Sequence, residues 1–345
     1  MAVVLRIGEN YAVGLLYVQV VHQILTEAVL SAIGNKILKY KDCFDIMNII
    51  VRRDFNTINE AVSAAQRGDN IIIPSGVYPE KVTVDKEDLS FTGDGFVTIT
   101  YDAASGKLAQ SGGIYDTFSS ATLTVTEAAA NFRADNITFE NNYNRIDSAR
   151  PLTQAVAVSC GADYASFENC NFLGCQDTLY VHSGGMFFHD CYIEGSVDFI
   201  FGNAQALFED CDINCVRSGS YITAANTSEK SDTGLVFYHC YISANEGCSD
   251  IYLGRPWRAE KDGINSAAAF IECTYNFDCT PEGWHPWNLQ PGTEQENTRY
   301  FEYKNEDLHG RRADISGRAP WSRQLSRSEA ESIMRIAGRY AKYSE

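Results

Sequence analysis

The chain has 345 residues, of which 45% are hydrophobic and 21% charged, so it can bury a large core and is not a disordered tail. Acidic residues outnumber basic ones by 45 to 28, and the resulting formal charge of −17 repels nucleic-acid phosphates and anionic membrane surfaces. We therefore expect no nucleic-acid partner and no membrane attachment. The eleven cysteines cannot all pair with one another, and they lack the paired C-x2-C clusters of zinc sites. Reduced, buried thiols and no metal site are expected.

The first 46 residues differ from the rest, because they carry four basic and four acidic residues and thus none of the excess negative charge. Residues 10–26 are uncharged but too polar for a membrane span, and they match a signal peptide only weakly. Apolar residues between Val21 and Val29 recur on one helical face. We therefore predict a helical extension over residues 1–46 and a single domain over residues 47–345. Translation of the working domain from Met47 is a hypothesis.

The apolar run that begins at Met47 predicts a first strand, and an internal repeat occupies the middle of the chain. The repeat unit has the pattern Phe-x-x-Cys-x-(Phe, Ile or Tyr), and it recurs at residues 167–172, 188–193, 208–213, 237–242 and 270–275. Residues 132–137 keep the frame upstream, with Asp135 in place of the cysteine. The successive spacings are 35, 21, 20, 29 and 33 residues and contain no helical pattern. Such a repeat predicts a solenoid with one coil per unit.

In a solenoid of strands, equivalent side chains stack about 4.8 Å apart, so the Phe, Cys and Ile positions predict ladders in the interior. Small, weakly polar cysteines suit such a narrow stack. Residues 55–65 predict a short amphipathic helix at one end of the stack. Ser326 and Glu329 form a capping box that predicts a helix at the other end. The fold class we predict is all-β, a right-handed parallel β-helix with short capping helices at its ends.

Two aspartates and two glutamines fall in register with this repeat. Asp177 and Asp198 are 21 residues apart, which is one coil, and Gln154 lies 22 residues before Gln176. We therefore expect Gln154, the Gln176–Asp177 pair and Asp198 on three successive coils of one face. Any one of them alone is more commonly a solvated turn residue, but two acids and two amides in register predict a site.

Paired carboxyls in one site cannot both ionise cheaply, so they supply an acid together with a base or nucleophile. Nearby amides can donate hydrogen bonds to a developing oxyanion. Arg255 is the candidate cation that keeps one carboxyl ionised, although such an arginine also occurs in surface ion pairs. Tyr180, Phe201 and Trp257 are candidate flat faces for sugar rings, or else core aromatics. None of the six histidines falls in these motifs and no G-x-S-x-G elbow occurs, which disfavours a serine hydrolase.

At these residues the sequence resembles the pectin methylesterases, carbohydrate esterases of the parallel β-helix class. The likeness is carried in order by Gln-Ala-Val-Ala from Gln154, Gly-Cys-Gln-Asp-Thr-Leu from Gly174, Val-Asp-Phe-Ile-Phe-Gly from Val197 and Leu-Gly-Arg-Pro-Trp from Leu253. The resemblance extends over about residues 49–335. One such motif can arise by chance, whereas an ordered set of four is specific.

The resemblance implies a role for each catalytic candidate. Asp198 matches a nucleophile that attacks the C6 methyl-ester carbonyl of a galacturonate unit and forms an acyl-enzyme anhydride. Asp177 matches the general acid that protonates methanol and then the base that activates water. Gln176 matches the main oxyanion donor, with Gln154 in support. Arg255 matches the residue that orients Asp198 and keeps it ionised.

The same resemblance implies that Tyr180, Phe201 and Trp257 line a sugar-binding groove. It implies pectin or methylated oligogalacturonides as substrate, no cofactor, and a monomeric enzyme. Residues 51–55 lack the family's usual glycine-rich run and the segment after Trp257 departs from its pattern, which bears on subsite preference rather than on the reaction. Without a clear signal peptide, and with reduced thiols, a cytoplasmic enzyme is expected; secretion, usual in the family, is the alternative.

Three other functions fit a β-helix. A glycosidase also uses two acids but creates new reducing ends, and a pectate lyase usually needs calcium, for which the sequence offers no acidic cluster. A non-catalytic carbohydrate-binding protein has no need to keep Asp177, Asp198, Gln176 and Arg255 together. We therefore expect a pectinesterase that releases methanol.

Overall fold

The structure is a computed structural model that describes residues 46–110, 112–143, 150–257, 263–287 and 298–341. The predicted helical extension falls almost wholly outside these residues and stays a prediction. From Met47 to Glu345 the chain forms one compact unit. No helix within the described ranges is long and apolar enough to cross a membrane.

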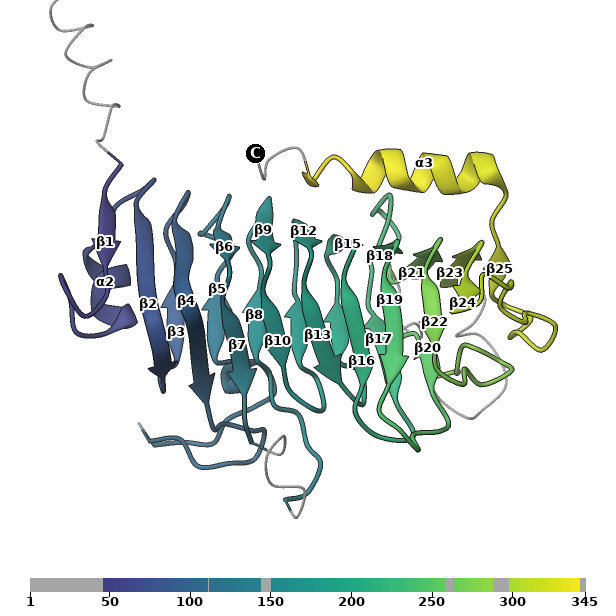
Figure 1. Cartoon of the computed structure of the whole chain (residues 1–345), viewed down its shortest axis with the longest axis horizontal. Helices are drawn as coiled ribbons and strands as arrows, with labels where there is room; N and C mark the ends of the chain where they lie inside the picture. Colours follow the sequence, from purple (N-terminus) through teal and green to yellow (C-terminus); the bar gives the residue numbers. More distant parts are fainter. Residues whose placement is uncertain (1–45, 111, 144–149, 258–262, 288–297, 342–345) are drawn as a thin grey trace, which may run out of the picture. The chain divides into compact units, whose positions relative to one another are not determined.

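Parallel strands stacked in successive coils build this unit, which is a right-handed parallel β-helix as predicted (Figure 1). The middle coils each contribute two strands to a larger sheet and a third strand to a smaller one. These coils comprise β9 (Ala165–Glu168), β10 (Asn171–Leu173) and β11 (Leu179–Val181); β12 (Gly185–His189), β13 (Tyr192–Gly195) and β14 (Ile200–Gly202); β15 (Gln205–Glu209), β16 (Asp212–Cys215) and β17 (Tyr221–Ala225); and β18 (Leu235–Tyr238), β19 (Tyr241–Ala244) and β20 (Tyr252–Gly254).

The coils on either side continue the same sheets. Before the middle coils come β1 (Asn48–Ile50), β2 (Asn70–Tyr78), β3 (Val82–Val84), β4 (Ser90–Tyr101), the 3₁₀ turn η1 (Phe118–Ser120), β5 (Leu123–Val125), β6 (Arg133–Asp135), β7 (Thr138–Asn141) and β8 (Val158–Cys160). After them come β21 (Ser266–Ile271), β22 (Thr274–Asn276), β23 (Thr298–Tyr303), β24 (Glu306–Asp307) and β25 (Arg323–Gln324). The smaller sheet runs in the order β20-β17-β14-β11-β8-β5-β3.

The predicted phenylalanine ladder fills the interior. Phe188 pairs with Phe167 on one side and with Phe208 on the other, and the register continues through Phe237 to Phe270. The four successive ring pairs are stacked, with centroids 4.5 to 5.0 Å apart. The spacing of the repeat therefore gave the correct register along these five coils.

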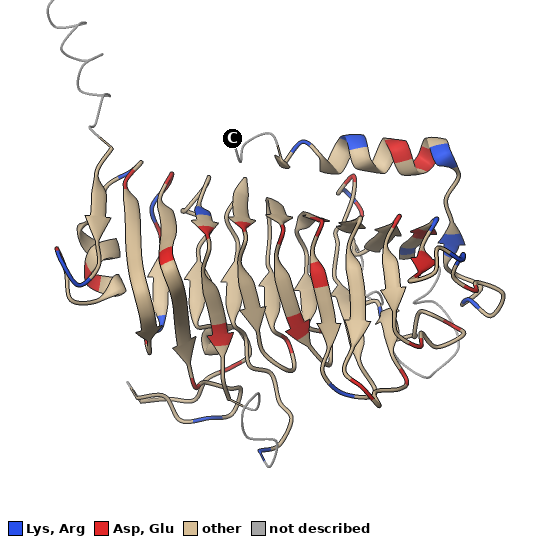
Figure 2. Ribbon diagram, in the orientation of Figure 1, with Lys and Arg blue, Asp and Glu red and all other residues tan. Residues whose placement is uncertain are grey.

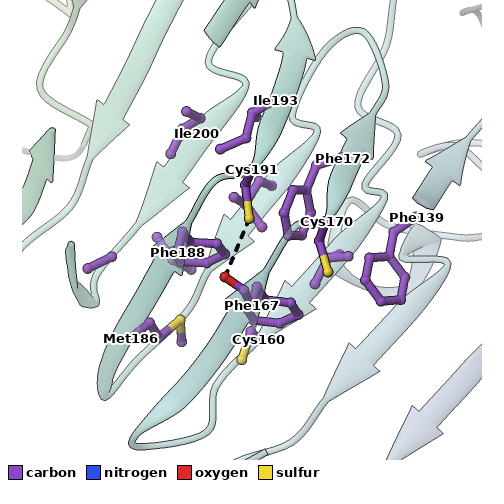
Figure 3. Packing of buried hydrophobic residues seen from close by; sticks show 14 of the residues in the cluster. Phe139, Cys160, Phe167, Cys170, Phe172, Met186, Phe188, Cys191, Ile193 and Ile200 are labelled. Carbon is purple, nitrogen blue, oxygen red and sulfur yellow. Dashed lines mark hydrogen bonds between the residues drawn. The ribbon is translucent and has the colours of Figure 1, made fainter. Parts of the chain in front are cut away.

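The cysteines of the repeat form a second ladder beside the rings (Figure 3). Cys191 is buried, and its thiol donates to the carbonyl oxygen of Phe167 at 3.4 Å. The residue before each of these cysteines, for example Asp190 at φ 49°, has a left-handed backbone that turns the chain between two strands. All ten cysteines within the described ranges are free thiols, and burial raises the pKa of Cys191 well above its ordinary value.

Upstream of these coils the predicted register is wrong by two residues. Phe167 pairs with Ala134, not with Phe132, and Phe172 pairs with Phe139. Phe132 lies just before β6, yet its ring reaches the same interior and packs 5.9 Å from the ring of Phe167. A long loop between β7 and β8 hides the length of the coil there. The register predicted from the sequence therefore differs from the one in the structure.

The two predicted helices both form, but they cover different surfaces. Helix α2 (Ile58–Ala64), capped by Thr57, contacts β2 and β3 at the first coils. Helix α3 (Arg327–Ala337) has the predicted capping box but does not close the far end. It packs along the outer face of the larger sheet, in one apolar cluster with residues of β12, β15, β18, β21 and β23 (Figure 1). The apolar stripe of α3 is covered there by apolar side chains of the sheet, such as Phe187, Leu207 and Val236.

The far end is closed by side chains of the last coils. Trp284 and Tyr300 pack with ring centroids 4.5 Å apart, and the ring of Trp321 lies 5.6 Å from that of Tyr300. Beside them, Arg318 and Glu302 form a buried ion pair at 2.8 Å. Charged side chains elsewhere lie mainly in turns, in loops and on α3 (Figure 2).

Candidate active site

The two predicted acids lie at equivalent places on adjacent coils. Asp177 stands two residues before β11 and Asp198 two residues before β14, and these strands pair with Leu179 opposite Ile200. The backbone N–H of Asp177 donates to the carbonyl oxygen of Val197 at 3.0 Å. The structure thus stacks the two aspartates on one face, as the 21-residue spacing predicted.

Both acids have a left-handed backbone, with φ of 62° for Asp177 and 52° for Asp198. Few residues other than glycine adopt this conformation, and aspartate is among those that tolerate it best. Structural turn residues such as Asn169 and Asp210 share it, so it belongs to the geometry of the coil. In the two acids it places the carboxyl two residues before a strand of the smaller sheet.

Arg255 reaches Asp198 across 57 residues of sequence. Its Nε donates to Asp198 Oδ1 at 2.8 Å and its Nη2 to Asp198 Oδ2 at 2.7 Å, the two-point contact that suits an arginine and a carboxylate. Arg255 directly follows β20, which lies beside β17 in the smaller sheet. Gly254 permits this close packing, because a Cβ there would overlap Oγ1 of Thr223.

The electrostatic environment separates the two carboxyls. Burial raises the pKa of Asp177 well above its ordinary value, and the charge of Asp198 raises it further. Burial also raises the pKa of Asp198, but hydrogen bonds and charge from Arg255 oppose that shift. Asp177 therefore holds its proton to higher pH than Asp198 does. This arrangement favours the proton on Asp177 and the negative charge on Asp198.

The two glutamines join the same line of residues. Gln154 and Gln176 pair as an isolated parallel bridge, which places them on adjacent coils. The side chain of Gln176 forms a hydrogen bond with Asp177 that favours the ionised form of that acid. Oε1 of Gln154 accepts from the Thr153 hydroxyl at 3.1 Å, which fixes the direction of the amide. An amide carries two N–H donors, which is the chemistry a developing oxyanion needs.

The three predicted aromatic residues lie together on the outer face of the smaller sheet. Tyr180 of β11 and Phe201 of β14 are opposite each other, with ring centroids 4.7 Å apart and planes at 21°. Trp257 meets Phe201 edge to face at 5.7 Å. Stacked rings are the kind of apolar surface that sugar rings contact, although Tyr180 and Phe201 are themselves buried in this structure.

Three further aromatic residues, which were not predicted, contact Arg255 or Tyr180. The Arg255 guanidinium lies over the rings of Tyr221 and Trp287, at 4.1 and 4.5 Å from their centroids. Phe118 packs on Tyr180 at 4.9 Å. Tyr221 follows Asp198 by 23 residues, about one coil, so the repeat contained the signal for it. Phe118 comes from an inserted loop and carries no such signal.

Metal chemistry was not expected at this site. Within the described ranges, no group of three or more His, Cys, Asp or Glu side chains is placed to hold a metal ion. The groups that interact with the two acids in the described ranges include Arg255, Gln176 and Tyr221.

Comparison with known proteins places the chain and its fold in one family. The pectinesterase family model matches residues 49–340. Pectinesterase 31 of Arabidopsis thaliana is 34% identical over 288 residues, covering 80% of this chain and 86% of its own length. A pectinesterase of Daucus carota is 37% identical over 286 residues, covering 78% and 83%.

Solved structures agree with the sequence relatives. The pectin methylesterase from carrot superimposes with a TM-score of 0.73 at 33% identity, covering 87% of this chain and 96% of its own. The pectin methylesterase from Erwinia chrysanthemi gives 0.68 at 26% identity, covering 86% and 96%. The resemblance inferred from four motifs is therefore confirmed over nearly the whole coil stack. The chain belongs to the pectinesterase family.

Proposed function

We propose that this enzyme hydrolyses the C6 methyl esters of galacturonate units in pectin or oligogalacturonides, with Asp198 as nucleophile. The observation that carries the proposal is the two-point contact of Arg255 with Asp198, beside an Asp177 whose pKa is higher. A structurally similar pectin methylesterase, 26% identical, is described in complex with a hexasaccharide, which supports an oligosaccharide ligand.

The first half of the reaction transfers the acyl group to Asp198. A carboxylate oxygen of Asp198 attacks the ester carbonyl carbon and forms a tetrahedral oxyanion, to which the amides of Gln176 and Gln154 donate hydrogen bonds. The C–OCH₃ bond then breaks, and protonated Asp177 gives its proton to the departing oxygen. Methanol leaves, and an anhydride joins Asp198 to the galacturonate carbonyl.

The second half restores the enzyme. Asp177, now ionised, takes a proton from a water molecule that attacks the anhydride carbonyl. The anhydride bond breaks, Asp198 leaves as a carboxylate paired with Arg255, and the sugar carries a free carboxyl group. The raised pKa of Asp177 suits both halves, because this group must hold a proton in the first and accept one in the second.

Methanol release from methylated pectin by the wild-type enzyme and by Asp198→Asn tests this assignment. Asparagine keeps the size of the side chain but is a very poor nucleophile, so we expect a loss of at least about 10³-fold in kcat. Asp212→Asn, on the exposed side of β16, is the matched control and should keep wild-type activity.

Two further measurements distinguish ester hydrolysis from glycoside hydrolysis and from lyase cleavage. A pectinesterase releases methanol without new reducing ends, whereas a glycosidase raises the number of reducing ends. A lyase produces unsaturated sugars that absorb in the ultraviolet. Equal methanol release by the wild type and Asp198→Asn would remove Asp198 from the mechanism.

We further propose that the enzyme acts as a monomer in a reducing compartment, with secretion as the alternative. The described cysteines are free thiols, as a reducing compartment favours, and most of them are buried. Cys170 and Cys191, for example, are buried with strongly raised pKa values. Fractionation of the producing cells and the mass of the protein in solution test the two statements.

A further inference from the structure

Tyr221 occupies a position in line with the catalytic acids. Thr223 of β17 pairs with Ile200 of β14, so Tyr221, two residues earlier, is level with Asp198, which stands two residues before Ile200. The line that contains Asp177 and Asp198 thus continues into an aromatic ring on the next coil. The tyrosine is half-buried and faces the same side of the smaller sheet as the acids, because Arg255 lies over its ring.

The guanidinium of Arg255 touches both kinds of neighbour at once. Its Nε and Nη2 hold the two oxygens of Asp198, while its central carbon lies 4.1 Å from the centroid of Tyr221 and 4.5 Å from that of Trp287. A planar guanidinium is attracted to the face of an aromatic ring without giving up its in-plane hydrogen bonds. The ring contact and the carboxylate contact therefore do not compete.

The ring of Tyr221 is itself held firmly. Tyr252, its partner in the next coil, stacks on it with centroids 5.2 Å apart and planes at 10°. His285 meets both rings nearly edge-on, at 5.5 Å from Tyr221 and 5.0 Å from Tyr252. A long arginine side chain loses rotamer freedom when it is fixed, and a rigid ring beneath it limits the conformations it can adopt.

We propose that Tyr221 is a positioning residue, whose ring keeps Arg255 in two-point contact with Asp198 during turnover. This inference rests on the function proposed above. The reaction creates a new carboxylate on the sugar close to Arg255, and that product anion competes with Asp198 for the guanidinium. The ring of Tyr221 holds the guanidinium of Arg255 against its aromatic face. This favours return of the guanidinium to Asp198 and release of the product.

The contact between Arg255 and Asp198 affects the acid limb of the profile of kcat/KM against pH. The ionisable groups that interact electrostatically with Asp198 in the described chain are Asp177, Arg255, Tyr221 and Tyr300. Of these, Arg255 opposes the upward shift of the Asp198 pKa that burial causes. When Arg255 loosens, Asp198 stays protonated to higher pH. The acid limb of kcat/KM must then move to higher pH.

The test compares Tyr221→Leu with Tyr221→Phe, measuring methanol release from methylated pectin across pH. Leucine fills the space but has no aromatic face, so we expect its acid limb to move up by about 0.5 to 1 pH unit and product inhibition to strengthen. Phenylalanine keeps the face, so its profile should coincide with that of the wild type. A Tyr221→Leu limb that coincides with the wild type, or a Tyr221→Phe limb that moves equally, would overturn the proposal.

Tyr241→Leu is the control, because it removes a half-buried tyrosine of β19 whose hydroxyl contacts Asn276 on the larger sheet. It should lower the melting temperature without moving the acid limb. If Tyr221→Leu does not fold, Tyr221→Met, with a flexible apolar side chain, carries the same test. Failure of the proposed function is distinguishable, because the wild type would then release no methanol at any pH.

Discussion

The interior and the outer face of the same coils follow opposite rules. In the interior, the same side chain recurs at equivalent positions of successive coils, and Phe188 stacks between two further phenylalanines. Outside, the side chain changes from coil to coil, from Asp177 to Asp198 to Tyr221 and then Tyr252. The uniform ladder fixes the spacing and register of the coils, so each coil can present a different group at a set height. The site is therefore formed by side chains that differ from coil to coil, while the interior side chains stay the same.

Asp177→Asn tests the outer face with the largest expected effect. It should lower kcat by about 10²- to 10⁴-fold with little change in substrate binding, because a general acid is lost while the shape is kept. Methanol release and the binding of a methylated oligogalacturonide measure the two. An unchanged kcat would remove Asp177 from the mechanism.

The same variant should stabilise the fold at neutral pH. The folded pKa of Asp177 is raised, so the unfolded chain loses this proton first and stability falls as pH rises between the unfolded and folded pKa values. Asparagine removes that cost, which should raise the free energy of unfolding at pH 7 by an amount on the order of 1 kcal/mol. Urea unfolding at pH 4 and pH 7 measures it. A gain as large at pH 4 as at pH 7 would contradict the titration account.

Phe188→Ala tests the interior. Removing a buried ring from the ladder leaves a cavity and should cost about 3–5 kcal/mol of stability. Urea unfolding measures this loss. The fraction that remains folded should keep the wild-type pH profile, because the acids on the outer face are unchanged. A cost below about 1 kcal/mol would show that the ladder is not what sets the stability of the coils.

Cys191→Ala has the smallest expected effect, a cost of about 1 kcal/mol, since one buried sulfur atom and its weak contact with Phe167 are lost. Cys248→Ala, at a half-buried thiol, is the matched control and should cost less. Counting reactive thiols before and after unfolding is the companion measurement. Rapid labelling of Cys191 in the folded protein would contradict its place in the interior.

The sequence predicted those parts of the molecule that the repeat spacing determines. Spacings of 20 to 33 residues gave the pairing of Phe167 with Phe188 and onward, and the 21-residue interval placed Asp177 level with Asp198. Arg255 was predicted from its motif rather than from spacing, because 57 residues separate it from Asp198 and loops of unequal length intervene.

What the sequence did not predict depends on loops and on side-chain direction. The pairing of Phe132 with Phe167 was predicted wrongly, because the insertion before β8 hides the length of that coil. Trp287 and Phe118 come from segments outside the repeat, so no periodicity marks their approach to Arg255 and Tyr180. The amphipathic pattern of α3 gave its length and cap, but an apolar stripe does not say which apolar surface it will cover.

That position of α3 changes how the coil stack can come apart. A simple solenoid gains its stability from contacts between neighbouring coils, so it can fray one coil at a time from an end. Helix α3 shares one apolar cluster with residues from Phe187 of β12 to Phe301 of β23, and so connects coils that are not neighbours. Unfolding of the last coils would also remove α3 from the coil that carries Asp198. The catalytic coils and the C-terminal end should therefore unfold together, as one cooperative block.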